Sequence, residues 1–205
     1  ELGRGDGAAT PGRPPSIEAC RRVAADESCV AVFMEQGKRA GLMVREAGTA
    51  DVAERVAEEI AAVSAKRVVV AGDAVTGPVL EEAAKRAGAV VVRRASVDDT
   101  FGADAALTDV AGAVAETGSL VYRSSATHGR SEPFVPGSHV VLVPASRIVA
   151  DLLDMDLGPS SDGSAVHVIS GPSKTADIEG ILVTGVHGPG VVRVVVWKDD
   201  AAGAD

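Results

Sequence analysis

Short apolar runs alternate with amphipathic segments through the first half of the chain. The apolar runs that have the length of buried strands are 42–45, 68–71 and 89–92. The segments with a helical pattern are 17–25, 29–40, 50–64 and 79–87. In 50–64, apolar residues recur every three or four positions and form one face. This alternation predicts an α/β fold in which a mainly parallel sheet is flanked by helices.

The second half continues the alternation with shorter units. The predicted strands are 105–107, 119–123, 139–143, 166–169 and 191–197. The predicted helices are 108–115, 146–153 and 176–186, and the last of these would close a β–α–β unit. The polar loops 124–138 and 154–165 are the places where a cleft or a partner surface would be built.

The chain predicts one domain and a short extension. Residues 1–15 are rich in Gly, Pro, Arg and Ala without an apolar period, so they are expected to be disordered or loosely attached. Residues 16–200 are expected to form a single α/β domain, with 16–48 as a helical lead-in. Aromatic residues make up only 2% of the chain, so the core must be built from Val, Ala, Ile and Leu.

Charge and composition exclude several classes of function. A net charge of −9 argues against a nucleic-acid-binding protein, which needs a basic face. No apolar run reaches the about 18 residues of a membrane span, and no signal peptide is recognised, so a cytoplasmic location is expected. Cys20 and Cys29 allow a disulfide on paper, but two cysteines cannot form a zinc or iron–sulfur site alone. The favoured interpretation is that both cysteines act as small hydrophobic residues near a helix. No metal site is expected.

The segment 170–179 concentrates candidate chemistry between a predicted strand and a predicted helix. Free N–H groups at a helix N-terminus, hydroxyl groups and the Lys174 ammonium would hold a carboxylate or a phosphate. The segment is not a phosphate-binding P-loop, because Ser173 stands where that motif requires glycine. The alternative is helix capping, with Thr175 as the N-cap and acidic residues in the first turn. The residues leave both interpretations open.

Other turns carry single candidate residues. Glu116 precedes the strand 119–123 in a Gly-containing turn, where it is either an acid, base or nucleophile or an exposed carboxylate. Asp104 has the same ambiguity. His187 and Gly188 follow the predicted helix 176–186, where they suit its C-terminus; a His187 that faces a cleft is the alternative. The sequence shows no Ser–His–Asp order, no metal-ligand spacing and no dinucleotide fingerprint.

Several motifs in order resemble one family. They are 102–106 (GADAA), 115–121 (AETGSLV), the loop ending at Pro136 with 139–143 (HVVLV), 170–179 (SGPSKTADIE) and 185–189 (GVHGP). Together they resemble LUD-domain proteins of the lactate-utilisation protein C type, over roughly residues 40–197. The resemblance implies a fold of the glucosamine-6-phosphate isomerase, ribose-5-phosphate isomerase and CoA-transferase-like type. It also implies an architecture similar to that of 5-formyltetrahydrofolate cyclo-ligases.

The resemblance implies a function and a set of partners. The expected role is that of a non-redox subunit that acts with iron–sulfur partner proteins in the oxidation of L-lactate to pyruvate. This chain would bind no cofactor itself, and the iron–sulfur clusters would lie only in the partners. The expected ligand is a small anion, either a carboxylate or a phosphate. The alternatives are a free-standing acyl or CoA transferase or sugar-phosphate isomerase, and a carboxylate-binding regulatory module.

The resemblance also nominates site residues. Glu116 is the catalytic candidate, as nucleophile or base. The substrate-binding candidates at motif positions are Thr117, Gly118, Ser170, Gly171, Pro172, Ser173, Lys174, Thr175, Asp177, Glu179, His187 and Gly188. Arg130 joins them because the acidic chain must draw an anion in through a local positive site. Lys174 stands where arginine is common in the family, and its ammonium lacks the planar fork that binds a carboxylate in two places.

Overall fold

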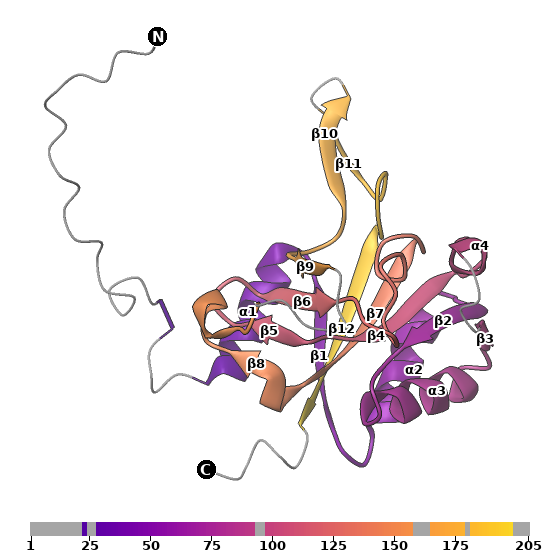
Figure 1. Ribbon diagram of the computed structural model, residues 1–205, viewed down its shortest axis with the longest axis horizontal. Coiled ribbons are helices and arrows are strands. Elements are labelled where there is room, and N and C mark those ends of the chain that lie inside the picture. Colours follow the sequence, from indigo (N-terminus) through magenta and orange to yellow (C-terminus); the bar gives the residue numbers. More distant parts are fainter. Residues whose placement is uncertain (1–21, 24–27, 93–96, 158–164, 179–180, 199–205) are drawn as a thin grey trace, which may run out of the picture.

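The computed structural model describes residues 22–23, 28–92, 97–157, 165–178 and 181–198. Within these ranges the chain forms a large sheet, a smaller sheet and a two-stranded hairpin that projects from the body of the molecule (Figure 1). The predicted helix 17–25 falls almost wholly outside the described residues, as does the extension 1–15.

The large sheet has six strands in the order β1-β12-β7-β4-β2-β3. These strands are β1 (Met43–Gly48), β2 (Arg67–Ala71), β3 (Val90–Val92), β4 (Ala105–Asp109), β7 (Ser138–Pro144) and β12 (Val191–Lys198). Every neighbouring pair runs parallel, and Val194 of β12 pairs with Val44 on one side and Val141 on the other. Their valine-rich runs are typical of parallel strands that are covered on both faces. The predicted α/β fold with a mainly parallel sheet is confirmed.

Helices cover one face of this sheet. Helix α2 (Val52–Ala62) and helix α3 (Thr76–Arg86) lie side by side on it (Figure 1). Their buried side chains, such as Ile60 and Leu80, share a cluster with Leu142 and Val195 of the central strands. A short helix α4 (Val97–Phe101) leads into β4. The predicted helices 50–64 and 79–87 are therefore confirmed, and their apolar faces form this side of the core.

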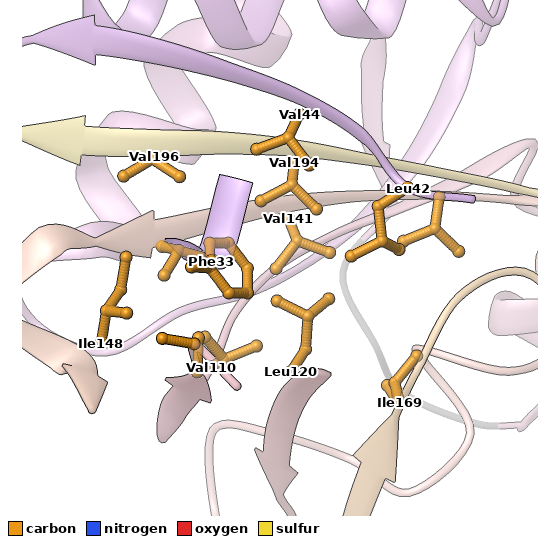
Figure 2. Close-up of a cluster of buried hydrophobic side chains, with 14 of the residues drawn as sticks. Phe33, Leu42, Val44, Val110, Leu120, Val141, Ile148, Ile169, Val194 and Val196 are labelled. Carbon is orange, nitrogen blue, oxygen red and sulfur yellow. The ribbon is translucent and has the colours of Figure 1, made fainter. Parts of the chain in front are cut away.

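Helix α1 (Cys29–Ala40) and the smaller sheet cover the opposite face. The smaller sheet has the order β8-β5-β6-β9. Its strands are β8 (Ile148–Val149), β5 (Gly112–Val114), β6 (Ser119–Arg123) and β9 (Val166–Ile169). Figure 2 shows Phe33 of α1 between valines of the large sheet, including Val194, and side chains of the smaller sheet, including Leu120 and Ile148. Phe33 is fully buried and joins α1 to both sheets.

Three predicted helices are wrong. Segment 108–115 contains the end of β4 and all of β5, which are buried throughout and thus show no polar face. Segment 146–153 contains most of the 3₁₀ turn η2 (Ala145–Arg147), strand β8 and part of the 3₁₀ turn η3 (Leu152–Asp154). Segment 176–186 lies in the hairpin of β10 (Lys174–Ile178) and β11 (Ile181–Thr184). In each case a short apolar run fits either period, and tertiary pairing decides between them.

Candidate functional site

Two of the predicted motifs meet at the base of the β10–β11 hairpin. The Gly185 N–H donates to the Ser173 carbonyl oxygen at 2.8 Å, and the Ser173 N–H donates to the Pro189 carbonyl oxygen at 2.9 Å. The motifs therefore lie side by side because two antiparallel strands join them, and not at the two ends of a helix. Thr175 pairs with Val183 in this ladder, so the prediction that it caps a helix is wrong.

A pocket of about 270 Å³ opens at this place. Five of the predicted substrate-binding residues line it, namely Ser170, Gly171, Ser173, His187 and Gly188. The remaining wall is largely apolar and is formed by Pro133, Phe134, Val168, Ile169 and Pro189. We call this the hairpin-base pocket. It offers two hydroxyl groups and one exposed imidazole against an apolar wall, which suits a small molecule with one polar end.

Two predicted glycines pack against α1. Gly118 has φ +64°, and a Cβ there would stand 2.1 Å from the Gly37 nitrogen. Gly171 has φ +111°, and a Cβ there would stand 2.3 Å from the Ala40 carbonyl oxygen. Only glycine allows both the positive φ and the close approach. These two motif positions therefore hold the smaller sheet and the loop after β9 against the helix.

Other predicted residues surround this contact. The Lys174 Nζ lies 3.6 Å from the position of a Cβ on Gly41, the residue that ends α1, so its charge complements the C-terminus of that helix. The Pro172 Cδ lies 3.3 Å from the same position. The Thr117 hydroxyl lies 2.7 Å from that of Ser119, which lies 2.6 Å from that of Ser170. This chain of hydroxyl groups connects the β5–β6 turn with the hairpin-base pocket.

Of the remaining predicted residues, those that the structure describes lie apart from this pocket lining. The Glu116 carboxylate pairs with the exposed Arg22 at 3.4 Å in the β5–β6 turn, a surface contact of little energy. Arg130 is exposed in the loop after β6. Asp177 lies in β10 with an undescribed side chain, and Glu179 lies outside the described residues. Asp104 accepts from the backbone N–H groups of residues 66 and 67, which lowers the pKa of its carboxyl group and gives it a structural role.

The structure reveals a second polar group that the sequence did not predict. Asp109 ends β4, Asp73 follows β2, and Arg147 lies in η2 directly after β7. The carboxyl ends of parallel strands meet at one edge of a sheet, which is where α/β proteins bind ligands. The Arg147 Nη1 donates to Asp109 Oδ2 at 3.1 Å, and its Nη2 donates to Asp73 Oδ2. One guanidinium therefore bridges two carboxylates from neighbouring strands.

Asp109 is the centre of this group. Its side chain is 2% exposed, and the Thr76 hydroxyl donates to its Oδ2 at 2.6 Å. Its Oδ1 contacts the Nε2 atom of His128, which comes from the loop after β6 and is 12% exposed. The other ring nitrogen of His128, Nδ1, lies 2.9 Å from the Thr127 hydroxyl and 3.1 Å from the Ser125 hydroxyl. We call Asp73, Thr76, Asp109, His128 and Arg147 the carboxyl-edge cluster.

Asp73 anchors this cluster to α3. Its Oδ1 accepts from the N–H groups of Val75 and Thr76 at 2.8 and 2.9 Å. Burial opposes ionisation of this carboxyl group, but the hydrogen bonds from Thr76 and Val75 and the Arg147 guanidinium outweigh it. The pKa of Asp73 therefore lies well below its usual value. The carboxylate is charged over the physiological range and holds Arg147 in place.

A pocket of about 350 Å³ lies beside the carboxyl-edge cluster. It is lined by Val70, Gly72, Gly77, Glu81, Val91, Val92, Thr127 and Glu132. Glu132 is buried, and its Oε2 accepts from the Tyr122 hydroxyl at 3.0 Å and from the Gly129 N–H at 2.6 Å. We call this the carboxyl-edge pocket. Among the residues that the structure describes, its lining holds two carboxylates and no lysine or arginine.

The sequence held one signal for this cluster. Asp73 and Asp109 each follow an apolar run closely, as ligand-binding residues of parallel sheets do. The signal at Asp109 was lost because 108–115 was predicted to be a helix. No Ser–His–Asp order is present along the chain, yet the fold brings a hydroxyl, an imidazole and a carboxylate together in space. Such groupings are recognised by geometry and not by order along the chain.

Comparison with curated proteins finds relatives of one name. A lactate utilization protein C of Bacillus pumilus is 38% identical over 95 residues, which cover 42% of this chain and 39% of the relative. That of Bacillus subtilis is 36% identical over 93 residues, with the same shares. That of Macrococcus caseolyticus is 34% identical over 120 residues, which cover 53% of this chain and 47% of the relative. The chain thus spans under half of the length of these relatives.

Comparison with solved structures agrees with the fold. A DUF162 family protein from Deinococcus radiodurans superposes with a TM-score of 0.55, at 19% identity, over 83% of this chain and 96% of that protein. At this identity the likeness concerns the fold alone. Among the described residues, no helix is long and apolar enough to cross a membrane, and no group of three acidic, histidine or cysteine residues is arranged to hold a metal.

The family follows from the extent of the match. The model of the LUD domain matches residues 30–197, which includes every strand of the large sheet except the last residue of β12. It includes both the hairpin base and the carboxyl-edge cluster. With the relatives and the shared fold, this places the chain in the LUD domain family.

Proposed function

We propose that this chain is a lactate-utilisation protein C-like subunit that acts with iron–sulfur partner proteins in the oxidation of L-lactate to pyruvate. The observation that carries the proposal is the similarity, at 34 to 38% identity, to proteins named lactate utilization protein C. In this proposal the iron–sulfur partners carry the electrons in the cytoplasm. This chain contributes a binding site and binds no cofactor of its own.

The hairpin-base pocket is our proposed site for the small carboxylate. Its volume of about 270 Å³ accommodates a small organic acid. The hydroxyl groups of Ser170 and Ser173 are hydrogen-bond donors for a carboxylate, and His187 is the ionisable residue of the lining. The apolar wall suits the methyl group of lactate. The carboxyl-edge pocket is less suited to an anion because the charged residues in its described lining are Glu81 and Glu132.

Deletion of the gene in its own host tests the role. We expect the deletion strain to lose growth on L-lactate as the sole carbon source and to keep growth on pyruvate. A copy of the wild-type gene restores growth on L-lactate. A tagged copy that restores growth should also retain iron–sulfur proteins on purification, recognised by their visible absorbance. Unimpaired growth of the deletion strain on L-lactate overturns the proposed role.

Ligand binding tests the proposed pocket separately. L-lactate should raise the melting temperature of the purified chain, because a ligand that binds only the folded state stabilises it by an amount that grows with the logarithm of the ligand concentration above its dissociation constant. Ser173→Ala should weaken this effect. Thr49→Ala is the matched control, since it removes a hydroxyl group near the carboxyl end of β1, away from the pocket lining. Equal stabilisation of both variants by L-lactate would mean that the carboxylate binds at another place on the chain.

A further inference from the structure

The Thr127 hydroxyl, the His128 imidazole and the Asp109 carboxylate follow one another in hydrogen-bond contact at the carboxyl-edge pocket. We propose that they form a nucleophile, a general base and an orienting carboxylate, and that Thr127 accepts the acyl group of a small ester or thioester. This activity goes beyond the proposed role in lactate utilisation and uses a different pocket.

The two contacts of His128 have the arrangement that activates a hydroxyl group. Its Nδ1 lies 2.9 Å from Thr127 Oγ1, within reach for taking the hydroxyl proton. Its Nε2 contacts Asp109 Oδ1 on the opposite side of the ring. In the neutral ring, Nε2–H donates to the carboxylate and Nδ1 accepts from the hydroxyl. The carboxylate therefore selects the tautomer in which Nδ1 acts as the base.

Asp109 is held firmly enough to orient the ring. Its second oxygen accepts from the Thr76 hydroxyl at 2.6 Å and from Arg147 at 3.1 Å. The side chain is 2% exposed, so water does not compete for these contacts. A buried carboxylate of this kind also stabilises the imidazolium that forms when His128 takes the proton. Asp109 is thus a positioning residue, and Thr76 and Arg147 support it.

Thr127 is a better nucleophile candidate than Ser125, although both hydroxyls reach His128. Thr127 is exposed and lines the carboxyl-edge pocket. Ser125 is half-buried, lies slightly farther from Nδ1 at 3.1 Å, and accepts from the Thr127 N–H at 3.3 Å. The Ser125 side chain therefore shapes the turn that presents Thr127 and His128.

The lining of the pocket indicates the class of substrate. Its volume is about 350 Å³, and Val70, Val91 and Val92 form an apolar wall from the carboxyl-terminal parts of β2 and β3. Glu81 and Glu132 are the charged residues of its described lining and repel a carboxylate or a phosphate. The carbonyl carbon of an ester or thioester is neutral and electrophilic. A short, uncharged acyl group fits this lining better than the anion expected for the hairpin-base pocket.

The proposed step balances without a cofactor. The Thr127 Oγ1 attacks the carbonyl carbon while its proton passes to His128 Nδ1. The bond from the carbonyl carbon to the leaving oxygen or sulfur breaks, and the leaving group takes the proton from Nδ1. The products are acyl-Thr127 and an alcohol or thiol. Water, or a second alcohol or thiol, then attacks the acyl group in the same manner and restores the Thr127 hydroxyl.

A fluorophosphonate tests the nucleophile directly. Its phosphorus forms a bond to an activated hydroxyl oxygen and loses fluoride, and mass spectrometry of peptides locates the product. We expect the wild-type chain to be labelled at Thr127, with a rate that falls at least about 100-fold when His128→Asn removes the general base. Thr127→Ala should abolish this labelling and Thr127→Ser should retain it. Thr49→Ala is the hydroxyl-deletion control, because Thr49 lies beside the edge strand β1 and lines neither pocket, and it should be labelled at Thr127 as fast as the wild type. Ser125→Ala should still be labelled at Thr127, but at a changed rate because Ser125 shapes the turn.

A second probe tests acyl transfer. With p-nitrophenyl acetate, the wild-type chain should release a burst of p-nitrophenolate equal to the amount of protein, and Thr127 should carry the acetyl group. Asp109→Asn should slow the burst while circular dichroism shows an intact fold. Labelling at Ser125, equal rates for wild type and Thr127→Ala, or a wild-type chain that reacts with neither probe would overturn the proposal. None of these results bears on growth on L-lactate.

Discussion

Gly171 lies against Ala40 so closely that a Cβ on Gly171 would stand 2.3 Å from the Ala40 carbonyl oxygen. This contact joins the loop after β9 to the last turn of α1. Gly118 makes the equivalent contact with Gly37 one turn earlier. The two glycines of the family motifs therefore fix the position of α1 against the smaller sheet. The hairpin base, which follows residue 171, is positioned by the same contact.

Gly171→Ala should destabilise the fold strongly. The new methyl group meets a backbone oxygen, and φ +111° is a conformation that alanine rarely adopts. We expect the free energy of unfolding to fall by about 3 kcal/mol or more, measured by urea denaturation. Gly88→Ala is the matched control, because Gly88 has φ +68° with no atom within 4 Å of its Cβ position. It should cost only about 1 to 2 kcal/mol, and equal losses would contradict the packing role.

Arg147→Met should also destabilise the fold, for an electrostatic reason. The substitution keeps much of the side-chain volume but leaves the buried Asp109 carboxylate without its guanidinium. Because Asp109 keeps the Thr76 and His128 contacts, we expect a loss of about 3 kcal/mol, at the lower end of the range for a broken buried pair. Arg86→Met removes a surface pair with Glu82 and should cost below about 0.5 kcal/mol. Denaturation of both variants in urea would show whether the two losses differ.

Asp73→Asn should change the stability of the chain in acid. The pKa of Asp73 is lower in the folded chain than in the unfolded chain, whose value is about 3.9. Its stabilising effect is therefore complete above about pH 4 and is lost as the pH falls toward the folded value. The wild-type chain should lose unfolding free energy over this range, and Asp73→Asn should start lower and fall less. Glu82→Gln, at a surface pair, is the control and should keep the wild-type slope.

The large sheet was predictable because each strand carries its own signal. The valine runs of β2, β7 and β12 are local in sequence, and parallel strands buried on both faces require such runs. The hairpin was not predictable in this way. Thr175 and Val183 lie in a segment whose apolar spacing also fits a helix, and their pairing across the hairpin decided the outcome.

The two candidate pockets also differ in how far local sequence patterns reveal their residues. The sequence prediction named five residues that line the hairpin-base pocket, because they sit in two short motifs, 170–173 and 187–188. The carboxyl-edge cluster was missed because Asp73, Asp109 and Arg147 are 36 and 38 residues apart along the chain. Only the order of β2, β4 and β7 in the sheet brings them together, and no local pattern encodes that order.

The burial of His139 predicts a second dependence of stability on pH, at a higher pH than that of Asp73. Its side chain is fully buried in β7, with Nε2 2.8 Å from the Thr108 hydroxyl and with no hydrogen-bond partner for Nδ1 among the described residues. Burial lowers the pKa of His139 to about 3. The unfolded chain takes up a proton at about pH 6.5, so it binds more protons than the folded chain between these two values. Stability therefore falls as the pH drops below about 6.5, by up to about 1.4 kcal/mol for each pH unit.

His139→Gln should remove this slope, since glutamine can meet Thr108 without titrating. We expect the free energy of unfolding of the variant, followed in urea from about pH 7 to about pH 4, to change less with pH than that of the wild-type chain. His187→Gln is the control, because His187 is exposed and should leave the slope as it is. Subtracting the unfolding free energy of the wild type from that of each variant removes the contribution of the carboxyl groups that titrate at about pH 4, because the two chains share them. If the variant keeps the pH dependence of the wild type, His139 is not its source. The buried imidazole would then accept its proton in the folded chain.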